Sequence, residues 1–355
     1  MLDCVRSGWV SSTGPQIERF ERAFADWLGA PHAIACTNGT SALHLALASL
    51  GIGPGDEVIV PSLTIISCAV AVLYTGARPV FVDVERSTGN IDVNLVERAI
   101  TRKTRAIMPV HLWGQPVDMA PLQRLAAKHR LLIVEDAAEA HGAAYQGKKV
   151  GTLGDAGCFS FYANKIITTG EGGMVVTARE SVAKKARLLR DLAHSPKRRF
   201  WHLEVGFNYR MTAMQAALGL AQLQEVDTYL AKKRWMAAEY SRRLSGIPGL
   251  TLPMELPGRT HVHWMYSVVV ERRFGKTRNA LMAYLQQHGI DTRTFFAPLH
   301  QQPVLRTLGL GRGKRLPVAE ELSRRGLYLP SGLAITEPQI DRVCEVVGRA
   351  ARGAD

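Results

Sequence analysis

The sequence has 355 residues, of which 46% are hydrophobic and 21% are charged, the composition of an ordinary globular protein with one large or two moderate domains. It contains no run of 18 apolar residues and begins MLDCVRSGWV, without the apolar core of a secretion signal. We therefore expect no membrane contact and a cytoplasmic location. Five scattered cysteines form no C-x-x-C pair, which argues against a disulfide framework and a metal site.

The net charge of +13 comes from 44 basic and 31 acidic residues. The excess is dispersed, with the densest clusters at HSPKRRF (194–200) and GRGKR (311–315). The chain lacks a basic arm, a helix-turn-helix signature and an aromatic RNA-binding motif, so we expect no nucleic-acid partner. The charge fits a phosphate-bearing small substrate, and a DNA-binding regulator stays a minor alternative.

The first two-thirds of the chain alternates β-like runs with amphipathic helical patterns, for example over 93–100 and 119–130. This alternation predicts an α/β fold with a mainly parallel sheet covered by helices. Ligands of such sheets bind at the carboxyl ends of the strands. The strand candidates are EVIV (57–60), PVFVD (79–83), RAIMPV (105–110), LLIVED (131–136), CFSFY (158–162) and GMVVT (173–177).

The pattern changes near Gln224. A helical segment over 224–245 is followed by a strand candidate, WMYSVVVE (264–271), and by helical patterns over 276–289 and 337–352. We therefore expect a large α/β domain, residues 1–224, and a smaller C-terminal α+β domain, residues 225–355.

Two motifs could bind an anion near a helix start. TNGTSALHLAL (37–47) is a small-residue turn that opens an apolar helix, where free N–H groups, the helix dipole and the Thr40 hydroxyl favour a phosphate. VGFNYRMTAMQAALGLAQL (205–223) places Asn208 and Arg210 before another helix. Taken alone, each motif is better explained by helix capping.

Two further motifs place charged groups after apolar runs. In IVEDAAEAHG (133–142), Asp136 needs a cationic partner such as a protonated pyridine nitrogen, or a metal, unless it only begins a helix. In FSFYANKIITTGEGG (159–173), burial would lower the pKa of Lys165 and free its amine for Schiff-base chemistry, while Ser160 could bind a phosphate. A lone lysine is more often a surface residue.

Together, the order and spacing of these motifs resemble the DegT/DnrJ/EryC1/StrS family of sugar aminotransferases, which use pyridoxal 5'-phosphate (PLP). The resemblance runs from SGWVSSTGP (7–15) into the C-terminal domain. It implies a fold-type I architecture like that of aspartate aminotransferase, with a seven-stranded sheet in the large domain. It also implies a homodimer with active sites at the dimer interface.

The resemblance assigns roles motif by motif. Lys165 looks like the lysine that carries the cofactor and moves protons, Asp136 resembles the acid that pairs with the pyridinium nitrogen, and Glu139 falls where a polar side chain approaches the ring oxygen. The other matches bind the cofactor phosphate (Gly39, Thr40, Ser160 and, from the partner subunit, Asn208) or face the substrate (Trp9, Arg210, His300 and His141). For His141, an ordinary buried histidine is the simpler interpretation.

The sequence departs from the family pattern in two places. In PSLTII (61–66), Ile65 stands where the family often has an aromatic ring over the cofactor, although an aliphatic face can still cover it. The chain also begins almost directly at SGW, without the family's usual leading segment. Some relatives carry histidine in place of the lysine and act as sugar dehydratases, so Lys165 favours transamination.

The stretches PSLTIISCAVAV, AIMPVHLWGQPVDM, EDAAEAHG and RRFWHLEVGFNYRMTAMQAALGLAQL look most like the perosamine-synthase branch of the family. That branch transfers the amino group of L-glutamate to C4 of GDP-4-keto-6-deoxy-mannose, and its cofactor cycles through pyridoxamine 5'-phosphate. The alternatives are C3 amination of a GDP-linked keto sugar, as in mycosamine formation, or a dTDP- or UDP-linked keto sugar. A PLP-dependent dehydratase and a DNA-binding regulator are more distant alternatives.

Overall fold

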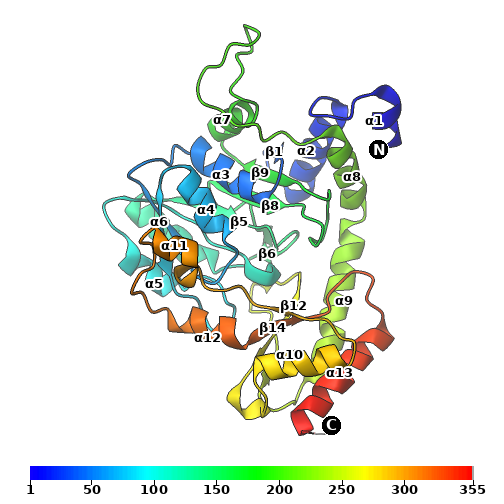
Figure 1. The fold of residues 1–355 in the computed structure, drawn as a ribbon. Helices are drawn as coiled ribbons and strands as arrows, with labels where there is room; N and C mark the ends of the chain where they lie inside the picture. The colour runs from blue at the N-terminus through cyan, green and yellow to red at the C-terminus, as the bar shows by residue number, and fades with distance from the viewer. Residues whose placement is uncertain (354–355) are drawn as a thin grey trace.

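The computed structural model describes residues 1–353, which form one large and two smaller β-sheets surrounded by helices (Figure 1). Its largest sheet has seven strands, in the spatial order β1 (His32–Cys36), β9 (Gly173–Thr177), β8 (Ala156–Ser160), β5 (Leu132–Asp136), β4 (Thr104–Ile107), β2 (Glu57–Pro61) and β3 (Arg78–Val82). The pairs from β8 to β3 are parallel, whereas β9 runs antiparallel to both β1 and β8. The predicted mainly parallel sheet is confirmed.

Helices cover both faces of this sheet, because successive strand residues point to opposite sides. Ile34 of β1 belongs to one core cluster, with α3 (Gly39–Ser49), α4 (Ser67–Tyr74) and α7 (Glu180–Arg190). Its neighbour Ala35 belongs to the other cluster, with α2 (Pro15–Leu28), α5 (Val93–Ala99), α6 (Met119–His129) and α8 (Ala213–Gln224). Burial on both faces explains why the strands read as continuous apolar runs.

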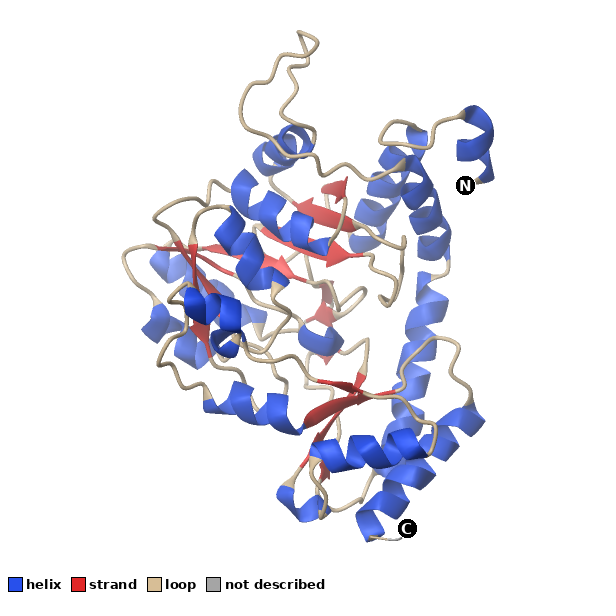
Figure 2. Cartoon of the chain, viewed as in Figure 1, coloured by secondary structure: helices blue, strands red, loops and turns tan. Residues whose placement is uncertain are grey.

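A second sheet of four antiparallel strands lies in the C-terminal part of the chain, in the lower half of Figure 2. Its order is β10 (Leu250–Thr251), β12 (Tyr266–Val270), β14 (Gly326–Leu329) and β13 (Arg293–Thr294). A third core cluster joins it to α9 (Val226–Leu244), α10 (Arg278–Gln287) and α13 (Glu337–Arg352). A small three-stranded sheet contains β11 (Arg259–Thr260), β6 (Ala144–Tyr145) and β7 (Lys148–Lys149).

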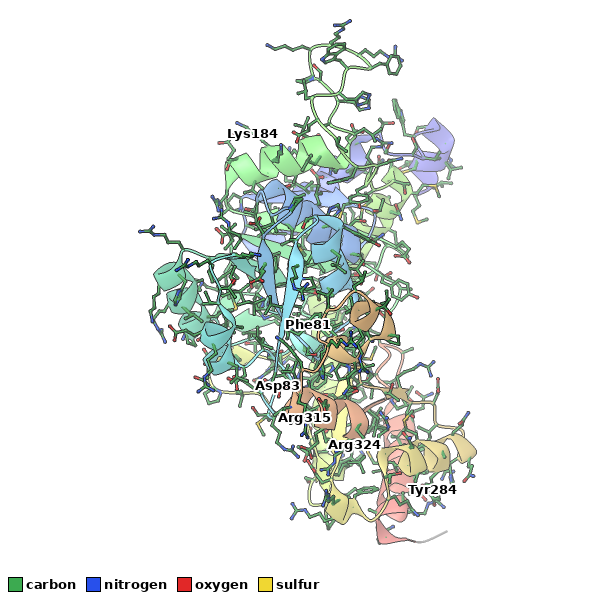
Figure 3. All side chains as sticks on the ribbon, turned by 60° about the vertical axis from the view of Figure 1, so that its left-hand side comes forward. Phe81, Asp83, Lys184, Tyr284, Arg315 and Arg324 are labelled. Carbon is green, nitrogen blue, oxygen red and sulfur yellow. The ribbon has the colours of Figure 1, made fainter. Side chains whose placement is uncertain are left out.

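Part of the C-terminal chain packs on the large sheet. The carboxylate of Asp83, which follows β3, accepts hydrogen bonds from the N–H groups of Val318 and Ala319 at 3.0 and 2.8 Å. Lys314 Nζ donates to the carbonyl of Phe81 at 3.0 Å. Figure 3 shows Phe81 and Asp83 close to the segment that contains Arg315.

The remaining short elements are α1 (Leu2–Ser7), η1 (Leu112–Gly114), η2 (Arg272–Phe274), η3 (Leu299–Gln301), α11 (Pro303–Thr307) and α12 (Pro317–Arg325).

Most predicted elements are present, with differences at their ends. The run HAIAC, which forms β1, was not among the strand candidates, because it has neither a clear alternation nor many large apolar residues. The helix expected from residue 224 begins at Val226, because α8 continues to Gln224 before a break at Glu225. The division into domains at residue 224 stays a prediction. Among residues 1–353, none of the helices has the length and hydropathy that a membrane crossing requires.

Candidate active site

A cavity of about 610 Å³ opens where β5 and β8 end and α3 begins. This edge of a parallel sheet is where ligands bind, because loops and helix N-termini converge there. The cavity brings together residues that are far apart in the sequence: Gly39, Thr40, Ile65, Asp136, Glu139, Ser160 and Lys165. A second cavity, of about 720 Å³, is lined by segments that follow α10 and β14 and by the start of α13, and by none of the predicted site residues.

The two acids that end β5 have different surroundings. The carboxylate of Glu135 is fully buried and accepts hydrogen bonds from His111 Nε2 at 2.9 Å and from the N–H of Gly151 at 2.7 Å. It also accepts from the N–H groups of Leu153 and Gly154, both at 2.6 Å. Glu135 therefore ties the loop before β8 to the end of β5, a structural task.

Asp136 instead faces the cavity, where it is 2% exposed. Its Oδ2 accepts from the thiol of Cys68 at 3.0 Å and its Oδ1 from the N–H of Ala138 at 3.0 Å. These donors fix the carboxylate but do not neutralise it. A buried carboxylate without a cation is costly, so the site suits a positively charged ring nitrogen.

The start of α3 lies at the cavity and has the features that suit a phosphate. Asn38 caps the helix, and its side chain accepts a hydrogen bond from Ser41 N at 2.8 Å. The N–H groups of Gly39 and Thr40, the first two residues of the helix, have no intrahelical acceptors and can bind an anion. A Cβ atom on Gly39 would lie only 2.8 Å from Ser160 Cβ, so glycine is required at this position. The Thr40 hydroxyl donates to Ser67 Oγ at 2.8 Å, at the same edge of the cavity.

Lys165 lies in the turn after β8 with its side chain 11% exposed. Its Nζ is 3.9 Å from Glu139 Oε1 and 4.0 Å from the centre of the Trp264 ring. The other oxygen of Glu139 accepts from the N–H of Trp113 at 2.8 Å. The amine is therefore held between a carboxylate and an aromatic face inside the cavity.

Burial shifts the pKa values of this pair toward neutral forms. Burial lowers the pKa of Lys165, opposed by the charges of Glu139 and Asp136. Burial likewise raises the pKa of Glu139 to about 7, opposed by Lys165 and the Trp113 N–H. A lowered pKa increases the fraction of Lys165 that is present as the neutral amine, the form that acts as nucleophile and base.

Several predicted residues lie outside the cavity of this chain. Trp9 is 53% exposed in the segment before α2. His300 is buried and bonded to Ser62 Oγ at 2.7 Å and Glu320 Oε1 at 3.0 Å. His141 is fully buried against Phe159 and Phe161, and burial lowers its pKa to about 3. The roles of these residues toward a substrate stay predictions.

Asn208 and Arg210 also lie outside it, on the strand-like segment before α8. Asn208 is exposed and pairs with Asp191 as an isolated bridge, and Arg210 forms an ion pair with the Asp191 carboxylate. Neither residue caps α8, because Thr212 and Gln215 form the capping box of that helix. Capping of α8 therefore does not explain these two residues, and their roles toward cofactor and substrate stay predictions.

The cavity also contains residues that sequence reasoning missed. It is lined by aromatic residues, among them Trp264, Tyr209, Tyr162 and Phe296. The thiol of Cys68 donates a hydrogen bond to Asp136. Trp264 was seen only as the start of a strand candidate, and no local pattern connects it with a lysine 99 positions earlier. Within residues 1–353, no group of three or more His, Cys, Asp or Glu side chains could hold a metal ion.

A buried lysine, a buried acid and a helix start with free N–H groups meet in one cavity at the edge of a mainly parallel sheet. Fold and site together define a PLP-dependent aminotransferase of fold type I. The chain belongs to the DegT/DnrJ/EryC1/StrS aminotransferase family, which it matches over residues 1–348. It is thus a sugar aminotransferase, and its cofactor is PLP.

Individual relatives agree with this assignment. The chain is 50% identical over 345 residues to the GDP-perosamine synthase of Caulobacter vibrioides, covering 97% of this chain and 92% of that protein. It is 41% identical over 344 residues to a dTDP-3-amino-3,4,6-trideoxy-alpha-D-glucose transaminase of Streptomyces venezuelae, covering 96% and 89%. The solved structure of S. venezuelae DesV has a TM-score of 0.94 at 40% identity, covering 100% of this chain and 94% of that chain.

Proposed function

We propose that this aminotransferase moves the amino group of L-glutamate to C4 of GDP-4-keto-6-deoxy-mannose, giving GDP-perosamine. The observation that carries the choice of sugar is the 50% identity to a GDP-perosamine synthase over nearly the whole of both chains. The site residues proposed here are those that the cavity brings together around Lys165. The basic excess of the chain suits a substrate with a diphosphate group.

The charged residues Lys165, Asp136 and Glu139 have proposed tasks in this reaction. Bound PLP supplies an electron sink that stabilises negative charge at the carbon bearing nitrogen. Lys165 Nζ takes the proton from Cα of the donor amino acid in the first half-reaction, and it delivers a proton to the sugar carbon in the second. Asp136 holds the ring nitrogen protonated, and Glu139 lies beside the amine that moves the protons.

The phosphate of the cofactor fits the start of α3. Gly39 and Thr40 offer N–H groups there, and Ser160 lies against Gly39. Ile65, at the same cavity, gives an apolar face for the ring where relatives often carry an aromatic residue. These residues would hold the cofactor within the cavity that contains Lys165.

The working unit is proposed to be a homodimer with shared active sites. Asn208 and Arg210 are exposed or half-buried outside the cavity of their own chain, which suits residues that complete the site of a partner. Asn208 would reach the cofactor phosphate and Arg210 the substrate. Trp9, His141 and His300 stay candidates for the sugar side of the site.

The function is tested by incubating the purified protein with PLP, GDP-4-keto-6-deoxy-mannose and ¹⁵N-labelled L-glutamate. Mass spectrometry should find ¹⁵N in the sugar nucleotide, and NMR should place it on C4. Lys165→Ala should abolish turnover while circular dichroism shows an intact fold. Transfer of nitrogen by that variant at a rate near wild type would refute the role of Lys165.

The same assay separates the alternatives. Nitrogen on C3 would identify a mycosamine-type enzyme. Turnover only of dTDP- or UDP-linked keto sugars would show that the nucleotide of the substrate is not GDP. The second of these has direct support in the 41% identity to the S. venezuelae transaminase. A product without nitrogen would indicate a dehydratase, and salt-sensitive DNA binding without cofactor would indicate a regulator.

A further inference from the structure

Trp264 presents the face of its indole ring to the amine of Lys165. The Nζ atom lies 4.0 Å above the ring centre, while Glu139 Oε1 is 3.9 Å from the same nitrogen. The aromatic face carries partial negative charge, so it attracts a lysine ammonium, most strongly where both are shielded from water. Both side chains are largely buried here, with Trp264 only 4% exposed.

Trp264 is held by three hydrogen bonds, one from its indole and two at its main chain. Its main-chain N–H donates to the carbonyl of Trp113 at 3.0 Å, and its Nε1 donates to the carbonyl of Asn164 at 2.8 Å. Asn164 directly precedes Lys165, so the second bond also holds the turn that carries the lysine. Trp113, through its own N–H, holds Glu139. The ring and the carboxylate on the two sides of Nζ are therefore positioned by one connected network.

The third bond comes from Lys233, a buried cation that the proposed reaction does not use. It lies in α9, is 4% exposed, and its Nζ donates to the carbonyl of Trp264 at 2.8 Å and to that of Ser331. Burial lowers its pKa to about 8. A buried lysine bonded to two carbonyls is a costly feature, and here it joins α9 to the chain just before β12 and just after β14.

We propose that Trp264 is a positioning residue for Lys165: its indole holds the lysine amine beside Glu139 whenever that amine is not bonded to the cofactor. The bond from Nε1 to Asn164 fixes the ring, and the bond from Lys233 fixes the main chain that carries it. The proposal rests on Lys165 being the reactive lysine of the proposed function. An amine displaced from the cofactor must stay within reach of the carbon atoms between which it moves protons. The ring and Glu139 define the place where it stays.

Other charged and titratable groups also act on Lys165. Asp136 at the end of β5, Glu139 in the following loop and the thiol of Cys68 in α4 all favour its ammonium form, and burial opposes them. His141 is fully buried nearby and has a lowered pKa, so it stays neutral near pH 7. None of these groups lies on the chain segment of Trp264, so a substitution of Trp264 leaves them in place.

The test measures the titration of Lys165 in the full-length protein without cofactor. Peptide mass spectrometry follows the acetylation of Lys165 by acetic anhydride as a function of pH. Trp264→Leu should lower the midpoint by about one pH unit, because a desolvated cation–π contact is worth up to about 2 kcal/mol. Trp264→Phe, which keeps a weaker aromatic face, should lie between Trp264→Leu and wild type.

Trp235→Leu is the matched control, since the Trp235 ring carries a cation–π contact with Lys232 at 3.7 Å on α9. It should leave the midpoint of Lys165 unchanged. A midpoint that is unchanged or raised in both Trp264 variants would overturn the proposal, and if Trp264→Leu does not fold, Trp264→Phe alone decides. The readout needs neither sugar nor turnover, so a wrong sugar or an absent transaminase activity would leave this result standing.

Discussion

Replacing Gly39 by alanine tests the proposed phosphate site at the start of α3 directly. The new Cβ would lie 2.8 Å from Ser160 Cβ, 3.2 Å from Ser160 Oγ and 3.4 Å from Ser160 Cα, closer than carbon atoms pack. Ser160 ends the central strand β8 and cannot withdraw easily. The start of α3 is also confined, because the Asn38 carbonyl already lies against Gly173 of β9, where a Cβ would be 2.2 Å away.

The helix start must therefore shift outward or Ser160 must turn, and both movements displace groups that would contact a phosphate. Overpacking of this kind costs about 1–3 kcal/mol. If that strain falls on the bound state, affinity for PLP drops by roughly 5- to 150-fold. We expect the dissociation constant of PLP, measured by absorbance or fluorescence titration of cofactor-free protein, to rise by about this factor.

Gly348→Ala is the control for a glycine-to-alanine change, since Gly348 lies inside α13 and a Cβ there would meet only Arg352 Nη1, at 3.6 Å. It should leave PLP binding unchanged and stabilise the protein by up to about 1 kcal/mol. Wild-type PLP affinity in Gly39→Ala, with an unchanged melting temperature, would refute the assignment of the phosphate to the start of α3.

Three other predictions concern the remaining site residues. Mixing inactive Lys165→Ala with inactive Asn208→Ala under subunit exchange should restore about a quarter of the wild-type activity. Half of the dimers are then hybrids, and one of the two sites in each hybrid has both residues intact. No recovery of activity would contradict a shared site. Cys68→Ala should weaken PLP binding several-fold while Cys68→Ser does not, because only the hydroxyl can replace the 3.0 Å donor to Asp136; equal affinities would contradict this role. The pKa of Glu139 is raised to about 7, so its contribution to stability is complete below about pH 4.5 and is lost as the pH rises through 7. In urea unfolding of cofactor-free protein, the free energy of unfolding of Glu139→Gln should therefore rise by up to ~3 kcal/mol relative to that of wild type over this range. Parallel pH profiles of the two proteins would contradict the raised pKa.

The sequence by itself determined the fold class and the main cofactor-site candidates. The apolar runs that form β2, β3, β5 and β9 were visible because strands buried on both faces need continuous hydrophobic residues. Asp136 ends such a run and Lys165 follows one within a few residues, and the order and spacing of the linked motifs singled both out. The sheet rule then placed both at one edge, and the structure does bring them into one cavity.

Only the tertiary structure decided which neighbours act on these residues. Glu135 and Asp136 are adjacent acids in the sequence, but the first binds a loop inside the protein and the second faces the cavity. Trp264 and Lys233 reach Lys165 through contacts between segments 31 to 99 residues apart, which no local pattern encodes. Residue spacing records strand and helix periods, whereas the surroundings of a buried charge depend on how distant elements pack.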